Sequence, residues 1–194
     1  MTTQHNQPPA SAPNSGPSSR VVVVEDRFCV PYTMVLTVNS VIFKDDGGNI
    51  VFKVDHELLR NLVVLFDADD NPIVFIKRKS TFMSSRWQVF RGSNKMLLFS
   101  VKRRSSWFNT KFDVFLASNT NETCCDFNVK ASEKSCEIYR KDTLIARVIH
   151  EYKLFGKDTF RVVICPQVDY AFIVALIVLF NEINREGSNL NTLN

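Results

Sequence analysis

The stretch that decides the fold is Asp169-Tyr170-Ala171-Phe172-Ile173-Val174-Ala175-Leu176-Ile177-Val178-Leu179-Phe180-Asn181-Glu182-Ile183. Every residue from Tyr170 to Phe180 is apolar, which makes 11 in a row. Asp169 is a favourable N-cap whose negative charge suits the positive end of a helix, and Gly187 is a typical C-cap residue. The pattern predicts a helix from residue 169 to about residue 186 that has no polar face along its apolar part.

A helix without a polar face must be surrounded either by lipid or by protein. Eleven helical residues rise about 16 Å, whereas the hydrocarbon core of a bilayer is roughly 30 Å thick and requires about 20 apolar residues. Asp169, Asn181 and Glu182 interrupt any longer apolar run. We therefore expect no transmembrane span, and we expect the rest of the chain to enclose this helix.

The chain has 194 residues, which is enough for one domain with a sizeable core. Residues 1–20 contain four prolines and several Ser, Asn and Gln residues, a composition typical of a disordered N-terminal tail. We expect a single domain over residues 21–186 with its central helix at residues 169–186. A flexible C-terminal tail is expected at residues 187–194.

Between the tail and the helix, short runs rich in β-branched and aromatic residues are separated by turn residues. The clearest turns are Asp45–Asn49, Asp67–Pro72 and Arg140–Asp142. The candidate strands are residues 21–24, 32–38, 50–54, 62–67, 72–78, 86–91, 96–102, 111–117, 124–129, 136–140, 143–149 and 159–165.

The strand count and the apolar helix predict the same architecture. An eight-stranded barrel is filled by its own side chains, and a helix is roughly 10 Å across. Enclosing a helix therefore requires a wider barrel of about eleven or twelve strands, and a closed barrel leaves no exposed sheet edge. The predicted fold class is mainly β, with an antiparallel barrel of about twelve strands around a C-terminal hydrophobic helix.

The sequence offers little support for catalysis. Glycine-rich phosphate loops and nucleophile motifs are absent, and the five cysteines contain no C-x-x-C pair, which favours reduced thiols. The segment that begins at Asp67 briefly resembles a calcium loop, but Pro72 stands where that loop needs Gly and Arg78 where it needs Glu. We therefore predict a protein that is not an enzyme and has no cofactor and no metal site.

Three segments resemble the plant LURP-one-related family: residues 169–178, residues 65–73 and residues 98–103. The resemblance covers about residues 28–185. It implies a fold similar to the tubby C-terminal domain and to phospholipid scramblases, in which a twelve-stranded barrel surrounds a hydrophobic helix. It also implies a plant protein linked to defence against oomycete pathogens. Tubby domains hold phosphoinositide headgroups through basic residues on the barrel wall, and the resemblance assigns no residue of that site to this chain.

The charge distribution is the most informative functional feature. Between Asn71 and Phe112 there is no Asp or Glu, and the same span holds 10 Lys and Arg residues. The whole chain carries +4, so the 14 basic and 20 acidic residues outside the span carry −6. Strand periodicity predicts that Lys102 and Arg104 share the outer face. The residues predicted to bind an anion such as a lipid headgroup are Lys77, Arg78, Lys79, Arg86, Lys102, Arg103 and Arg104.

Three further residues in or near this span, Trp87, Trp107 and Phe108, have side chains suited to a membrane interface. Such a positive sector attracts anionic lipid at about 1 kcal/mol per nearby Lys or Arg. It can equally follow nucleic-acid phosphates, or it can be a solvated face whose charges keep strands from aggregating.

Three functional hypotheses follow. In the first, a cytoplasmic monomer docks reversibly on phosphoinositide membrane or on a protein partner during defence signalling, at the plasma membrane or in the nucleus. In the second, a soluble carrier or enzyme has a site at the barrel mouth. In the third, a transcription-related protein binds nucleic acid and is tethered at membranes, by analogy with tubby. No RNA-binding motif, zinc finger or basic helix in the sequence supports the third hypothesis.

Overall fold

The computed structural model describes residues 19–39, 41–57, 62–81, 84–104, 110–121, 123–132, 135–151 and 159–191. These residues form a short 3-10 helix η1 (Asp26–Phe28), twelve strands and one long helix, α1 (Tyr170–Asn191). The strands are β1 Met34–Asn39, β2 Ile42–Asp45, β3 Ile50–Glu57, β4 Leu62–Asp67, β5 Pro72–Thr81, β6 Ser84–Arg91, β7 Leu97–Arg104, β8 Thr110–Leu116, β9 Phe127–Ala131, β10 Ser135–Arg140, β11 Thr143–Glu151 and β12 Thr159–Ile164.

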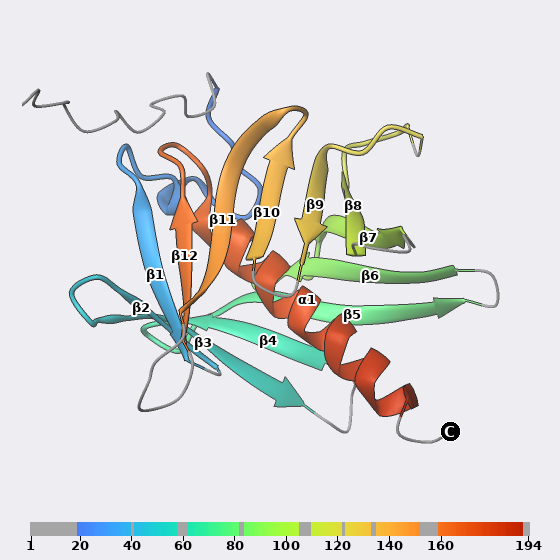
Figure 1. The fold of residues 1–194 in the computed structure, drawn as a ribbon, viewed down its shortest axis with the longest axis horizontal. Helices are drawn as coiled ribbons and strands as arrows, with labels where there is room; N and C mark the ends of the chain where they lie inside the picture. The colour runs from blue at the N-terminus through green and yellow to red at the C-terminus, as the bar shows by residue number, and fades with distance from the viewer. Residues whose placement is uncertain are drawn as a thin grey trace, which may run out of the picture.

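The twelve strands form a single closed barrel. Each strand pairs antiparallel with the next one along the chain, and β1 also pairs with β12, which closes the sheet. Figure 1 shows α1 running obliquely across the space that the strands surround. The predicted fold class, an antiparallel barrel of about twelve strands around a C-terminal hydrophobic helix, is therefore confirmed.

The helix is enclosed on all sides. Every residue from Ala171 to Phe180 is buried, and none is more than 6% exposed. The Phe172 ring centroid lies 5.1 Å from that of Phe99 on β7 and 4.9 Å from that of Phe127 on β9. Immediately before the polar part begins, Phe180 stacks on Phe112 of β8 at 4.5 Å. Aromatic side chains of the wall thus fill the space between helix and sheet, as the absence of a polar face requires.

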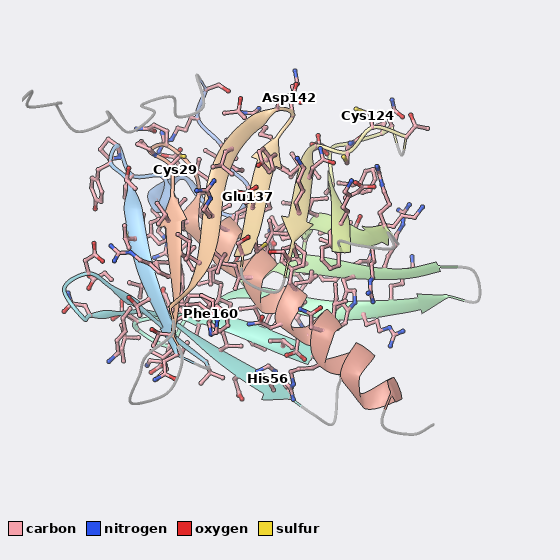
Figure 2. The ribbon with its side chains drawn as sticks, in the orientation of Figure 1. Cys29, His56, Cys124, Glu137, Asp142 and Phe160 are labelled. Atoms are coloured by element: carbon pink, nitrogen blue, oxygen red, sulfur yellow. The ribbon has the colours of Figure 1, made fainter. Side chains whose placement is uncertain are left out.

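The barrel has two different ends. At the closed end, Cys29 and Val21 lie beside the start of α1. At the opposite end, which we call the exit end, α1 leaves the barrel and its residues Asn181, Asn184 and Arg185 are exposed. Figure 2 places Cys29 near the start of α1, and His56 and Phe160 towards the exit end.

The segment 21–24 is not a strand of the barrel, contrary to the prediction. Val21 forms one isolated parallel bridge with Val168, and Cys29 one antiparallel bridge with Asp169. The twelfth strand is instead β2, which the sequence pattern missed. Only four residues long and followed at once by a glycine turn, β2 is too short to show a two-residue periodicity, and Phe43 is its one buried residue.

The Asp169 carboxylate explains why residues 21–29 cross the closed end. Its Oδ2 atom accepts hydrogen bonds from the amides of Val23 at 3.1 Å, Val24 at 2.6 Å and Glu25 at 3.2 Å. Its Oδ1 atom accepts the Phe172 amide at 3.0 Å, which confirms the predicted N-cap. Burial raises the pKa of Asp169, while these four donors favour the carboxylate and oppose that rise. One side chain therefore both caps the helix and holds the N-terminal segment over it.

The predicted helix end is wrong. The helix passes through Gly187 and continues to Asn191, so residues 187–191 of the predicted C-terminal tail are helical. A glycine inside a helix costs only about 1 kcal/mol relative to alanine, and no proline follows Cys165-Pro166 to stop the helix. Residues 1–18 and 192–194 of the two predicted tails lie outside the described residues.

The three predicted turns connect β2 to β3, β4 to β5 and β10 to β11. Gly48 adopts a φ of +80° in the first turn, a conformation that favours glycine. In the second, Asp67 Oδ1 accepts the amides of Asp69 at 3.1 Å and Asn71 at 2.9 Å. The Asp67 carboxylate is therefore used to stabilise a turn, which agrees with the rejection of a calcium loop.

Substituting Val174 tests the enclosure of the helix. Val174→Asp places an unpaired carboxylate at a position with no exposure, and burying a charge costs several kcal/mol out of a typical total stability of about 5–15 kcal/mol. We expect the loss of soluble folded protein, measured by soluble yield and size-exclusion chromatography. Asn181→Asp, about two helical turns further on and exposed, is the control and should fold. A Val174→Asp protein that stays monomeric with unchanged melting would place the helix outside the barrel.

Substituting Asp169 tests the closed end. Asp169→Ala leaves four backbone amides without their acceptor, so we expect the free energy of unfolding to fall by about 3 kcal/mol or more. Asp142→Ala, in the exposed turn between β10 and β11, should change it by less than about 0.5 kcal/mol. Urea denaturation of both variants provides the measurement. Equal, small effects would show that the N-terminal segment is not held by Asp169.

Candidate anion-binding surface

Strand pairing aligns basic residues in two rows across the barrel wall. In the first row, Lys79 on β5 pairs with Arg86 on β6, which pairs with Lys102 on β7. In the second row, Arg104 on β7 pairs with Lys111 on β8, which pairs with Lys130 on β9. Adjacent strands are about 4.8 Å apart, so each row spans roughly 10 Å.

Both rows lie on the outer face of the barrel. Side chains alternate between the two faces of a strand, and the neighbours Trp87, Val101 and Phe112 are buried in the core. The prediction that Lys102 and Arg104 share the outer face is therefore confirmed. Lys77 lies on the same face of β5, two residues before Lys79. We call these seven residues the basic wall: Lys77, Lys79, Arg86, Lys102, Arg104, Lys111 and Lys130.

Two of the seven predicted site residues lie on the other face of the sheet. Arg78 pairs with Trp87, and Arg103 pairs with Phe112. Because both partners are buried, Arg78 and Arg103 belong to the inner face near the strand ends, although both are exposed. The structure thus groups five of the predicted residues and separates these two from them.

Trp87 is not available to a membrane interface, contrary to the expectation. It is 7% exposed and packs in the core, because it shares the inner face with Val89 two residues later. Trp107 and Phe108, the other two aromatic residues expected there, lie outside the described residues.

One carboxylate enters the basic wall from β8. Arg104 donates to Asp113 Oδ2 from Nη2 at 2.7 Å and from Nε at 3.0 Å, and Asp113 is only 8% exposed. The span that is free of acidic residues in the sequence is therefore not free of them in space. Because Arg104 is already paired with the Asp113 carboxylate, its charge is less available to a ligand than the charges of its neighbours.

The remaining cations differ in how they are engaged. The Arg86 guanidinium lies 5.7 Å from the Phe115 ring and Lys130 Nζ lies 4.5 Å from the Tyr139 ring, both in cation-π geometry. No ion-pair or hydrogen-bond partner is found within the described ranges for four lysines: Lys77, Lys79, Lys102 and Lys111. Like charges directly opposite one another on a sheet are destabilising, so an anion placed between them would relieve that repulsion.

A groove of about 330 Å³ lies at the edge of the basic wall. Its apolar lining comes from Leu62, Phe75 and Phe90, and three charged residues border it: Glu57, Lys77 and Lys95. An apolar groove that is bordered by two cations and a carboxylate can accommodate a molecule that has an apolar part and polar groups.

Three residues of this surface were not singled out by the sequence. Lys111 is one of the 10 basic residues of the acid-free span but was not selected, while Lys130 and Asp113 lie beyond that span. Only the register of β8 with β7 and β9 brings them together. The local sequence of these strands contains no signal for that register.

Two kinds of site are absent from the described part of the chain. None of its helices is long and apolar enough to cross a membrane. Nowhere in these residues do three His, Cys, Asp or Glu side chains lie close enough together to hold a metal ion.

Comparisons with known proteins give a consistent result. The sequence profile of the LURP-one-related family matches residues 28–181. The chain is 38% identical to Protein LURP-one-related 15 of Arabidopsis thaliana, over 92% of this chain and 94% of that protein. It is 35% identical to Protein LURP-one-related 10 of the same plant, over 87% and 99%.

A solved structure agrees with the fold. The X-ray structure of an Arabidopsis thaliana protein superposes with a TM-score of 0.68 and 36% sequence identity, covering 84% of this chain and 98% of that one. Neither the family description nor the names of these relatives state an enzymatic activity. From the family match over most of the barrel and the identity to full-length relatives, the chain belongs to the LURP-one-related family.

Proposed function

We propose that this protein is a non-enzymatic, peripheral membrane-docking protein whose basic wall binds anionic phospholipid headgroups on the cytoplasmic leaflet. The two rows of three cations carry the proposal. Docking would serve defence signalling, the role that the family resemblance implies.

The size of the rows favours a headgroup with several phosphates. Each row spans roughly 10 Å, and the rows are two residues apart along β7, which is about 7 Å. A headgroup with one phosphate would contact one or two of these cations, whereas a polyphosphorylated inositol ring could contact a whole row. We therefore propose phosphoinositides as the preferred lipids.

The lysines without a partner provide the expected affinity. Each basic residue near an anionic membrane contributes about 1 kcal/mol. Lys77, Lys79, Lys102 and Lys111 together would contribute about 4 kcal/mol, which is roughly a thousandfold in membrane partitioning. Arg104 would contribute less because Asp113 already neutralises it.

Exposed apolar residues favour a membrane over a nucleic acid as the anionic partner. Val41, Ile149 and Phe160 are 39%, 40% and 41% exposed and lie at or near the exit end. The basic wall reaches towards the same end, since Lys79 and Arg104 lie near the ends of β5 and β7. Apolar side chains gain free energy from insertion between lipids but have no partner along a phosphate backbone.

Removing the two lysines of the first row tests the proposal. In co-sedimentation with phosphatidylcholine vesicles that contain phosphatidylinositol 4,5-bisphosphate, Lys79→Ala/Lys102→Ala should lower the partition coefficient by roughly 30-fold, the equivalent of about 2 kcal/mol. Wild-type binding should weaken as salt is raised, because the Debye length falls from about 8 Å at 0.15 M to about 3 Å at 1 M.

The matched control removes two lysines from other parts of the barrel. Lys44 on β2 and Lys141 in the turn after β10 are both exposed, so Lys44→Ala/Lys141→Ala loses the same net charge. Equal weakening by both double variants would mean that only net charge matters and would contradict the basic wall as a site. If the protein binds duplex DNA more tightly than the vesicles at matched salt, the anionic partner of the basic wall is a nucleic acid and not a lipid.

A further inference from the structure

A cavity of about 650 Å³ opens at the exit end, where α1 leaves the barrel. It lies between β2, β3 and β12 on the wall and the last buried turn of the helix. Figure 2 shows His56 and Phe160, which come from β3 and β12, at this end of the barrel. A second cavity of about 260 Å³ shares Phe160, Asn181 and Asn184 with the first and extends along another side of the helix. The volume of the larger cavity falls in the range of small-molecule sites, about 300–1,000 Å³.

One part of the wall of the larger cavity is apolar. Phe43, Val54 and Val178 form its inner part and are buried, while Val41 and Phe160 form its mouth. The two mouth residues are 39% and 41% exposed, which is unusual for large apolar side chains directed to the inside of a barrel. A ligand with an apolar body would cover them.

The polar end of the cavity is built around Glu182. Its Oε1 atom lies 2.9 Å from Arg185 Nη1 and 3.4 Å from His56 Nδ1. The Glu182 side chain is only 15% exposed, and both of these contacts end on the same oxygen, Oε1. A carboxylate accepts at both of its oxygens, so Oε2 can take a hydrogen bond from a donor inside the cavity.

The charges around Glu182 restrict the ligand. An anion would meet the carboxylate in a site of low exposure, which is unfavourable. A cation would compete with Arg185, which already neutralises the same carboxylate. A neutral hydroxyl can donate to Oε2 without disturbing either ion, and it can do so while its apolar body contacts Phe160.

We propose that the exit-end cavity binds an uncharged amphiphile, a small ring molecule with a hydroxyl group at one end, whose hydroxyl donates to Glu182 and whose ring packs against Phe160 and Val54. This site is separate from the basic wall. The cavity would bind its ligand through apolar contacts and one hydrogen bond, whereas the basic wall would bind through charge. One of the two proposals can therefore be wrong while the other is right.

The test uses three naphthalene probes with the full-length protein. 2-Naphthol is neutral at pH 7 and carries the hydroxyl, 2-methylnaphthalene replaces the hydroxyl by a methyl group, and 2-naphthoate is the anion. Fluorescence titration of 2-naphthol, followed by competition with the other two, gives all three affinities. We expect saturable 2-naphthol binding with a Kd below about 1 mM. 2-Methylnaphthalene should bind about 3-fold or more weakly for lack of the hydrogen bond, and 2-naphthoate more weakly still.

Two variants separate the apolar and polar parts of the site. Phe160→Ala should weaken 2-naphthol binding about 5-fold or more through lost apolar contact. Glu182→Met should abolish the preference for 2-naphthol over 2-methylnaphthalene while leaving 2-methylnaphthalene binding within about 2-fold. A general structural role for Glu182 would weaken both probes equally, so this preference is the decisive measurement.

The matched control is Ile149→Ala. Ile149 has nearly the same exposure as Phe160 and pairs with its neighbour Arg161, but it does not line the cavity. Ile149→Ala should leave 2-naphthol binding unchanged, and thermal unfolding should confirm that each variant is folded. The proposal is overturned if 2-naphthol binding is not saturable, if 2-naphthoate binds more tightly than 2-naphthol, or if Phe160→Ala weakens binding no more than Ile149→Ala. Glu182→Met changes neither the basic wall nor the exposed apolar residues at the exit end, so its vesicle binding reports on the first proposal separately.

Discussion

The four hydrogen bonds that end on the Asp169 carboxylate are the constraint on which the closed end depends. They join residues 23–25, near the start of the described chain, to the first turn of the helix that follows the last strand. Backbone hydrogen bonds from Val21 to Gln167 and from Gln167 to Val30 lie beside them. Because the carboxylate is fully buried, water does not compete for these bonds. The helix therefore has a fixed position along the barrel axis.

A fixed and fully packed helix decides where function can be located. Barrels with an empty interior can hold a ligand in the middle, but here aromatic rings from β7, β8 and β9 contact Phe172 and Phe180 and fill that space. The chemistry that remains is on the outer face and at the end where the helix becomes polar. That change is abrupt, since Phe180 is buried and Asn181 is exposed.

The two candidate sites lie on different strands and would bind their ligands through different interactions. The basic wall occupies β5 to β9, where antiparallel register places like charges opposite one another at the expense of stability. The cavity occupies β2, β3, β12 and the helix, where exposed apolar groups lie beside the Glu182 carboxylate. Both features are locally unfavourable in the free protein, and a bound partner would relieve each of them. Such local conflicts are expected at functional sites.

The sequence by itself determined that a barrel must surround a helix. Eleven apolar residues with no polar face are too few to span a bilayer and too many to leave in water. Most of the strands could be predicted from turn residues and from the periodicity of apolar residues. The acid-free span also determined that the molecule has a positive sector. Only the tertiary structure decided which cations share a face, that Asp113 and Lys130 join them and that Trp87 turns inward. It also brought His56 next to Glu182. Pairing register is a long-range property, and a shift of one residue moves every side chain of a strand to the opposite face.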